Sequence, residues 1–203
     1  MTENMLEFEQ KYWDMGYRVV AGVDEAGRGP LAGAVYAAAV VFEPGVVLPE
    51  VDDSKKLSEK RREELAEKIK EKALCWAVAS VDEKEIDRIN ILNAAIKAFG
   101  LALDGLEMRP EFAIIDGNRA TGLQYPYETI VKGDARSQSI AAASILAKVA
   151  RDNYIVKMDE VYPEYGFAKH KGYPTKEHKA AVAQYGPCPI HRLTFAGVRE
   201  HVR

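Results

Sequence analysis

Short apolar runs recur along the first two-thirds of the chain, and their composition is typical of buried β-strands. The runs are rich in Val, Ile and aromatic residues, and segments that contain Gly or Pro separate them. They predict strands at residues 17–24, 33–42, 73–81, 112–116 and 127–131. Because segments of helical periodicity lie between the strands, the pattern predicts an α/β fold.

The predicted helices cover residues 4–15, 58–72, 90–107, 135–159 and 175–185. Ser58 and Thr175 are N-cap candidates, since a side-chain hydroxyl can accept a hydrogen bond from the first turn. Asp82 and Glu85 form a start that resembles a capping box. The middle of residues 135–159, IAAASILAKVA, is small and apolar on nearly every side. We therefore expect this helix to be buried against the sheet.

The composition changes after Pro163, where Gly, Pro and basic residues become frequent. Between Tyr165 and Arg203 the chain has seven Lys or Arg residues and only two acidic ones, although its net charge is −3. We expect residues 1–160 to form an α/β core and residues 161–203 to form a basic helical cap of the same functional unit. Such a surface suits contact with phosphate groups, and an ordinary solvated surface is the alternative.

Several classes of protein do not fit this sequence. No apolar run reaches the roughly 18 residues of a membrane span, and the acidic N-terminal segment lacks the order of a signal peptide. The two cysteines form no CxxC pair, which argues against a disulfide scaffold and a cysteine-rich zinc site. The spacing of the four histidines matches no common zinc pattern. A cytoplasmic enzyme agrees with these features.

Acidic residues stand at the ends of two predicted strands, with Asp24 and Glu25 after the first and Asp116 after the fourth. Sites in α/β sheets gather at the carboxyl ends of strands, and neighbouring parallel strands lie about 4.8 Å apart. Asp24 and Asp116 converge if their strands are neighbours. Asp134 precedes the long predicted helix, where a helix N-terminus favours an anion. Each acid alone could be a turn or capping residue.

Taken together, these acids predict a site for a hard cation. An all-oxygen set of ligands without Cys or clustered His favours Mg²⁺ or Mn²⁺. Carboxylates, such cations and a basic flank suit cleavage of a phosphodiester by two metal ions.

The turn after the first strand, DEAGRGPLAG, is rich in glycine. No Lys-Ser/Thr pair follows its last Gly, and its spacing differs from GxGxxG, so it is not a common nucleotide-binding loop. Gly27 and Gly29 would let a ligand approach the backbone closely, with Arg28 between them. A tight turn with an exposed Arg is the alternative.

Several longer segments, in this order along the chain, resemble the bacterial ribonuclease HII family. They are AGVDEAGRGPLAGAV at 21–35, DSKKLS at 53–58, IIDGN at 114–118, ETIVKGDARSQSIAAASILAKVARD at 128–152, YGFAKHKGYPTKEH at 165–178 and YGPCPIHRLTF at 185–195. The resemblance implies an RNase H-like fold, with a mixed five-stranded sheet flanked by helices and a C-terminal helical extension. It also implies an endoribonuclease that cuts the RNA strand of RNA–DNA hybrids and nicks 5′ of single ribonucleotides in duplex DNA.

The resemblance further assigns roles to residues of this chain. Asp24, Glu25, Asp116 and Asp134 would be catalytic and would hold two divalent cations, Mg²⁺ or Mn²⁺, giving products with 5′-phosphate and 3′-hydroxyl ends. Gly27, Arg28 and Gly29 would contact the ribonucleotide 2′-hydroxyl, and Tyr173 would pack on the sugar at the RNA–DNA step. Lys55, Lys56, His170 and Lys171 are expected phosphate contacts. A monomer is expected. With little chain after Phe195, the sequence gives no indication of a sliding-clamp partner.

Three other functions remain open at this level. Another nuclease of the RNase H-like fold, such as a resolvase or transposase-type core, would share the acids but not the 2′-hydroxyl requirement. A nucleic-acid-binding module would carry the acids for structural reasons alone. A nucleotide-binding protein would use the glycine-rich turn.

Overall fold

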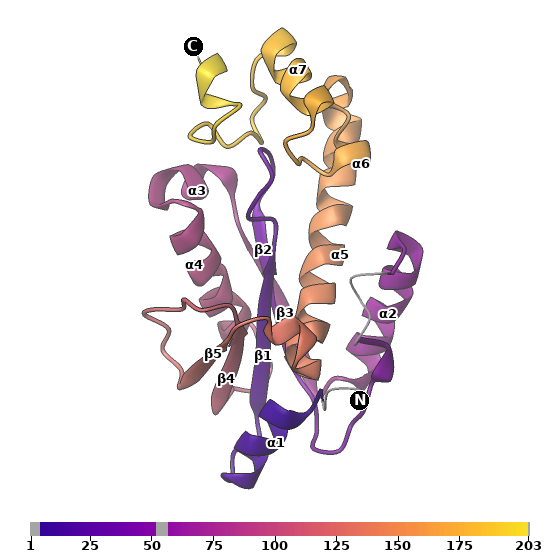
Figure 1. The fold of residues 1–203 in the computed structure, drawn as a ribbon, viewed down its shortest axis with the longest axis vertical. Coiled ribbons are helices and arrows are strands. Elements are labelled where there is room, and N and C mark those ends of the chain that lie inside the picture. Colours follow the sequence, from indigo (N-terminus) through magenta and orange to yellow (C-terminus); the bar gives the residue numbers. More distant parts are fainter. Residues whose placement is uncertain (1–4, 52–56, 203) are drawn as a thin grey trace.

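The computed structural model describes residues 5–51 and 57–202, and a mixed five-stranded sheet forms its centre (Figure 1). The strands are β1 (Val20–Ala26), β2 (Val35–Val41), β3 (Cys75–Val81), β4 (Phe112–Asp116) and β5 (Tyr127–Ile130), in the order β3-β2-β1-β4-β5. β2 is antiparallel to both β1 and β3, whereas β1, β4 and β5 run parallel. Each strand falls on a predicted apolar run, which confirms the predicted α/β class.

Helices cover both faces of the sheet (Figure 1). On one face, α4 (Ile91–Asp104) packs on β1, β2 and β3, with Phe99 and Leu103 in the shared core. On the other face, α5 (Gln138–Val161) packs on β1 and β2, and α2 (Glu59–Lys72) packs on α5. This double cover explains why the middle of α5 is apolar on nearly every side, as the sequence predicted.

Helix α5 approaches β1 unusually closely at Gly22. A Cβ atom at this position would lie 2.2 Å from the backbone carbonyl carbon of Ser139, so any side chain there would force the helix away from the sheet. Since side chains alternate along a strand, Asp24 points to the same face as Gly22. The strand that carries Asp24 is therefore held directly against α5.

Two of the differences between the predicted and the observed helix boundaries have a clear local cause. Asn90 has a positive φ of 68° and separates α3 (Glu83–Ile89) from α4, so the predicted helix 90–107 begins after a break. The long helix starts at Gln138 rather than at 135, because the Ser137 side chain caps it by accepting a hydrogen bond from the Ile140 N–H. Ser58, Asp82 and Thr175 cap α2, α3 and α7 as predicted.

Smaller elements complete the fold. Helix α1 (Glu7–Asp14) packs beneath the sheet in a cluster with Val20 and Ile114. None of the described helices has the length and apolar character that crossing a membrane requires. The remaining short elements are η1 (Pro49–Val51), η3 (Gly133–Ala135), η4 (Pro163–Tyr165), α6 (Phe167–His170), α7 (Lys176–Tyr185) and η5 (Arg199–His201).

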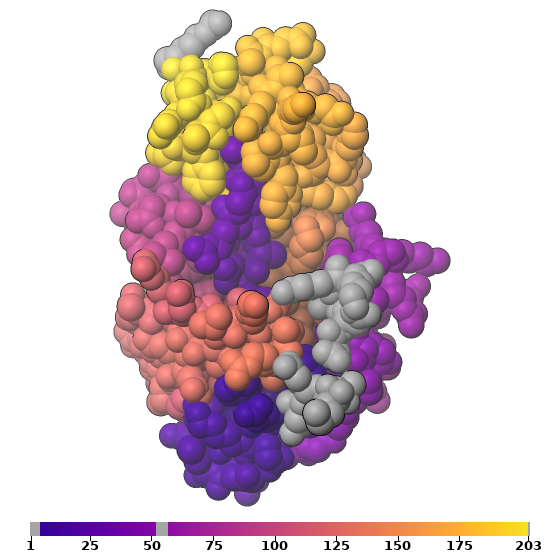
Figure 2. Space-filling model, in the orientation of Figure 1, coloured from indigo at the N-terminus to yellow at the C-terminus, as the bar shows by residue number. Residues whose placement is uncertain are grey.

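The C-terminal residues sit at one end of the molecule and are bonded to the turn that follows β1 (Figure 1). The Leu31 N–H donates to the Gly172 carbonyl at 2.8 Å, and the Gly33 N–H donates to the Ile190 carbonyl at 2.9 Å. The Arg192 N–H donates in return to the Leu31 carbonyl at 2.8 Å. Figure 2 shows the early chain, in purple, reaching the surface where the yellow C-terminal residues meet the core.

Candidate active site

Asp24 and Asp116 lie side by side at the ends of two neighbouring parallel strands. In the register of β1 and β4, Val23 is paired with Ile115, so the two aspartates occupy the next position on each strand. Both side chains follow the face of Gly22 and Ile114, which is the face covered by α5. The conditional expectation from the sequence is confirmed, because β1 and β4 are parallel neighbours.

The environment of Asp24 opposes its negative charge. The residue is only 5% exposed, and burial, followed by the charges of Glu25 and Asp116, raises the pKa of this carboxyl well above its usual range. Hydrogen bonds from the Ser144 side chain and the Glu25 N–H oppose this rise without overcoming it. A bound cation would offset the repulsion between this buried carboxylate and its two acidic neighbours.

Glu25 lies between the acids and the turn that follows β1. Burial raises the pKa of its carboxyl, although Arg28 lies 3.3 Å away in an ion pair. Glu25 lines two hollows. One, of about 290 Å³, also includes Asp116, and the other, of about 330 Å³, includes Lys148 and Tyr173. This carboxylate therefore connects the acidic strand ends with the basic surface.

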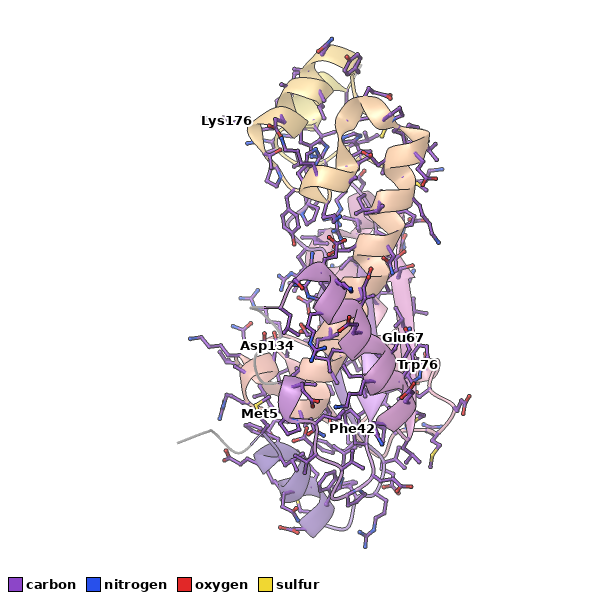
Figure 3. All side chains as sticks on the ribbon, turned by 90° about the vertical axis from the view of Figure 1, so that its right-hand side faces the viewer. Met5, Phe42, Glu67, Trp76, Asp134 and Lys176 are labelled. Carbon is purple, nitrogen blue, oxygen red and sulfur yellow. The ribbon has the colours of Figure 1, made fainter. Side chains whose placement is uncertain are left out.

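The end of β4 also positions Asp134. The Asp116 carboxylate accepts hydrogen bonds from the Gly133 N–H at 2.7 Å and the Asp134 N–H at 3.4 Å. Asp134 is in η3, at the end of α5 farther from the C-terminal helices (Figure 3). The alternative that Asp134 caps the long helix is wrong, because Ser137 does so.

The donor set at the strand ends suits a divalent metal ion. Among the residues that the structure describes, no three His, Cys, Asp or Glu side chains are grouped closely enough to hold an ion. The four acids nevertheless supply only oxygen atoms, and hard cations such as Mg²⁺ and Mn²⁺ prefer oxygen. A divalent cation would also offset the negative charge of Asp24, which burial and the neighbouring acids disfavour. This chemistry therefore fits a divalent cation at the strand ends.

The glycine-rich turn and Tyr173 form one surface beside these acids. A Cβ atom at Gly29 would lie 3.7 Å from the Tyr173 ring, so the backbone of the turn lies against that ring. The Tyr173 side chain is 40% exposed, and Lys148 and Arg151 each place a cationic group 5.7 Å from its ring centre. The structure thus places together two segments that the resemblance assigned to the ribonucleotide and to the adjoining RNA–DNA step.

Two buried arginines hold this surface, and sequence reasoning missed both. Arg192 donates to the carbonyl oxygens of Gly27, Arg28 and Gly33 at 2.5 to 2.9 Å. Burial, with the nearby charge of Arg151, lowers the pKa of Arg192 to about 9, so it remains charged at neutral pH.

Arg151 completes the support from α5. Its Nη2 atom donates to the carbonyls of Ala32 and Lys171, which joins the turn after β1 to the segment before Tyr173. A Cβ atom at Gly27 (φ 100°) would lie 2.3 Å from the Arg151 Nε atom, so only glycine fits there. The available signal in the sequence was an arginine that directly follows the apolar middle of this helix.

The remaining predicted phosphate contacts have different outcomes. His170 is buried, its Nε2 atom is bonded to the Tyr165 carbonyl, and its Nδ1 atom accepts from the Gly172 N–H. Because both ring nitrogens are used within the protein, the structure does not support a phosphate contact by His170. Lys171 is bonded to the Ala168 carbonyl and paired with Glu59 at 3.2 Å. Lys55 and Lys56 lie outside the described residues.

Comparison with known proteins assigns the chain to a family. A family model described as Ribonuclease HII matches residues 21–198. Ribonuclease HII of Geotalea daltonii is 53% identical over 199 residues, which cover 98% of this chain and 92% of the relative. The chain belongs to the ribonuclease HII family. The member from Caldicellulosiruptor bescii is 51% identical over 193 residues, 95% of this chain and 94% of the relative.

Solved structures agree with the ribonuclease HII assignment. The crystal structure of ribonuclease H2 from Pyrococcus horikoshii OT3 has a TM-score of 0.75 at 32% identity, covering 89% of this chain and 95% of that one. The crystal structure of Bst-RNase HIII in complex with Mn²⁺ has a TM-score of 0.66 at 18% identity, with 91% and 69% covered, which shows the same fold. The expected RNase H-like fold is confirmed. As a member of the family, the chain is an endoribonuclease that hydrolyses the RNA strand of RNA–DNA hybrids.

Proposed function

We propose that this enzyme also nicks duplex DNA on the 5′ side of a single embedded ribonucleotide, leaving 5′-phosphate and 3′-hydroxyl ends. The observation that carries the proposal is the contact between Gly29 and Tyr173 beside Glu25. This arrangement offers a polar backbone turn and a flat apolar ring next to carboxylates. A ribose followed by a deoxyribose would match this arrangement, since the ribose has a 2′-hydroxyl for the turn and the deoxyribose has an apolar face for the ring.

The acidic strand ends supply the hydrolytic centre in this proposal. Asp24 and Asp116 would hold two divalent cations from adjacent strands, and Glu25 and Asp134 would complete the oxygen ligands. When bound, such cations supply an activated water and stabilise the charge on the leaving oxygen. Asp24, on the central strand β1 between β2 and β4, is the acid that we assign to contact both cations.

Specificity depends on recognition of the 2′-hydroxyl, the group that distinguishes RNA from DNA at one nucleotide. Backbone groups of Gly27, Arg28 and Gly29 would form hydrogen bonds with it. A deoxyribonucleotide would leave such a backbone group unpaired, which typically costs about 1–3 kcal/mol. The exposed face of Tyr173 would pack on the deoxyribose that lacks the hydroxyl.

Basic side chains around the hollow would bind the phosphate backbone. Arg62 and Lys148 line it together with Glu25 and Tyr173. The substrates would therefore be RNA–DNA hybrids and duplex DNA that contains ribonucleotides. We further propose that the enzyme acts as a monomer, because one chain supplies all four acids, the turn and Tyr173. We propose the cytoplasm as the place where it acts.

The test compares three duplexes that differ in one feature. The first contains a single ribonucleotide, the second is all DNA, and the third is a long RNA–DNA hybrid, each incubated with Mg²⁺ or Mn²⁺. The proposal predicts a metal-dependent nick 5′ of the single ribonucleotide, cutting of the hybrid, and an intact all-DNA duplex. Cutting of the hybrid without the single-ribonucleotide nick would contradict it.

A further inference from the structure

Three histidines gather in the C-terminal segments next to Tyr173. His170 ends α6, His178 lies in α7, and His191 lies in the segment after α7. All three side chains are buried, and the His170 ring stacks on the His178 ring with centroids 4.4 Å apart. The hydrolytic centre described above uses none of them, so their burial needs another explanation.

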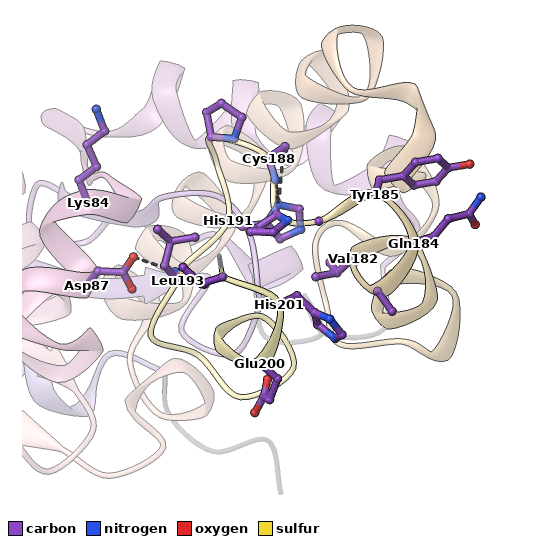
Figure 4. A pocket seen from close by; sticks show the side chains of 15 residues that line it. Lys84, Asp87, Val182, Gln184, Tyr185, Cys188, His191, Leu193, Glu200 and His201 are labelled. Atoms are coloured by element: carbon purple, nitrogen blue, oxygen red, sulfur yellow. Dashed lines mark hydrogen bonds between the residues drawn. The ribbon is translucent and has the colours of Figure 1, made fainter.

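Two of these histidines form a continuous chain of hydrogen bonds that ends on Tyr173. The Cys188 backbone N–H donates to the His191 Nδ1 atom at 2.9 Å (Figure 4). The His191 Nε2 atom lies 3.0 Å from the His178 Nε2 atom. The His178 Nδ1 atom lies 3.0 Å from the Tyr173 carbonyl oxygen.

The two ends of this chain of hydrogen bonds determine which nitrogen of each histidine ring carries a proton. A backbone N–H can only donate, so the His191 Nδ1 atom accepts and its proton is on Nε2. That proton points to the His178 Nε2 atom, which must accept it, so the His178 proton is on Nδ1. A carbonyl oxygen can only accept, and it receives this last proton. All three bonds are satisfied only when both rings are neutral and carry these different tautomers.

We infer that His178 and His191 are positioning residues for Tyr173, and that they set its carbonyl, and with it its ring, for recognition of the RNA–DNA step. This inference rests on the function proposed above for Tyr173. A recognition group must be held within about 0.5 Å of its productive position by residues that are themselves fixed. The chain of hydrogen bonds from Cys188 through His191 and His178 to Tyr173, called the relay below, supplies such support from buried side chains.

The local backbone explains why this loop needs support. Lys171 and Gly172 both have positive φ, at 52° and 81°, so the chain reverses direction just before Tyr173. The Tyr173 carbonyl also accepts a hydrogen bond from the Thr175 N–H at 2.8 Å. The His178 ring therefore completes the contacts that fix this carbonyl at the start of α7.

The surroundings keep both rings neutral. Burial lowers the pKa of His178 and of His191 to about 4, and His170 adds to this effect on both. Burial also raises the pKa of the Cys188 thiol to about 11, so the sulfur atom, 3.0 Å from His191 Nδ1, remains protonated. The other ionisable groups that act on Cys188 are the carboxylates of Glu164 and Glu83. A proton added to the His178 Nε2 atom would face the His191 Nε2–H group, and one added to the His191 Nδ1 atom would face the Cys188 N–H group.

The outer end of the relay has a route to solvent. Cys188 and His191 line a hollow of about 800 Å³ between α7 and η5, with Tyr185 and His201 on its wall (Figure 4). His178 lies deeper and is fully buried. Acidification would therefore reach the pair through His191.

The first test is independent of catalysis. Nitrogen-15 NMR of the histidine rings in the full-length protein reports which nitrogen of each ring carries the proton. The relay predicts the Nδ1–H form for His178 and the Nε2–H form for His191, without titration near neutral pH. The opposite tautomer on either ring, or protonation of the pair near pH 6.5, would overturn the inference.

The second test separates positioning from general stability. The side-chain amide of Asn can place a donor where His178 has Nδ1, whereas Leu cannot donate. Relative to cutting of the long hybrid, His178→Leu should lower kcat/KM on the single-ribonucleotide duplex about tenfold, and His178→Asn should restore most of it. The ratio of kcat/KM on the single-ribonucleotide duplex to kcat/KM on the long hybrid should be no lower in the double variant, which adds Tyr173→Ala, than in His178→Leu alone.

Three results of the second test would overturn the inference. These are an unchanged substrate ratio in His178→Leu, equal loss on both substrates, and full additivity with Tyr173→Ala. If the unmodified enzyme does not nick the single-ribonucleotide duplex, the proposed function fails, and the tautomers measured by NMR still decide whether the relay exists.

Discussion

The Arg192 guanidinium donates to the Gly27 carbonyl oxygen at 2.5 Å and to the Arg28 carbonyl oxygen at 2.9 Å. A residue of the C-terminal segment therefore fixes the turn that follows the first strand. The two carbonyl groups are bonded to the guanidinium, which restricts the conformations that this turn can adopt. If the turn recognises the ribonucleotide as proposed, the C-terminal segment would contribute to that recognition through Arg192.

Replacing Arg192 with Lys should disorder the turn while keeping the positive charge. A single ammonium group cannot match the planar fork that reaches the Gly27, Arg28 and Gly33 carbonyls. We expect a loss of about 1–3 kcal/mol in the free energy of unfolding and a lower preference for ribonucleotide over all-DNA duplex. Urea unfolding and cleavage assays measure the two effects. Arg199→Lys, at an exposed position, is the matched control and should change neither.

Asp24→Asn should abolish cleavage and at the same time stabilise the metal-free protein. The substitution removes a buried charge that faces Glu25 and Asp116. We expect a gain on the order of 1–2 kcal/mol in the free energy of unfolding, as for other residues kept for function at a cost in stability. Thermal unfolding in the presence of a chelator tests this. The exposed Asp14→Asn variant serves as control. A destabilised or active Asp24→Asn variant would contradict this account of the acids.

Tyr173→Ala should reduce nicking at a single ribonucleotide more than cutting within a long hybrid, by about tenfold, since the apolar contact between the ring and the deoxyribose would be lost, a contribution of about 1–2 kcal/mol. Tyr173→Phe should retain most activity because the flat ring remains. Steady-state rates on the two substrates give the ratio. Tyr185→Ala removes another exposed tyrosine and should leave the ratio unchanged. Equal losses on both substrates in Tyr173→Ala would remove Tyr173 from junction recognition.

Stability should fall as the pH drops from about 6.5 to about 4. The pKa values of His178 and His191 are lowered in the folded protein from the ordinary 6.5 to about 4, chiefly by burial. Between these values the unfolded chain binds more protons than the folded one, so acid favours unfolding. Urea unfolding across this range measures the slope, which His178→Asn should reduce. A slope unchanged by that variant would show that this ring is not responsible.

Local sequence determined much of this fold, because strands and helix caps depend on residues close together in the chain. The apolar runs that end at Asp24 and Asp116 predicted β1 and β4, and Ser58 and Thr175 cap the helices they were expected to cap. The pairing of the two aspartates was only conditional, since strand order is decided by packing. The break at Asn90 was missed because it depends on one backbone angle.

Features that join distant segments could not be read from the sequence. Arg192 appeared only as one of several basic residues, yet its partners are carbonyl groups at Gly27, Arg28 and Gly33. Backbone carbonyls leave no signal in the identity of a residue. His170 was expected to contact phosphate because of its basic neighbours, but folding uses both of its ring nitrogens internally.

The most direct test of ribonucleotide recognition compares two duplexes that differ only in the substituent at one 2′ position. One contains a single ribonucleotide, and the other contains the 2′-fluoro analogue at the same position, which is similar in size but cannot donate a hydrogen bond. The two are mixed in equal amounts with enzyme and Mg²⁺ or Mn²⁺. If the turn at Gly27–Gly29 reads the hydroxyl beside the carboxylates, only the ribonucleotide duplex is nicked, on its 5′ side. Equal cutting of both duplexes would contradict the account.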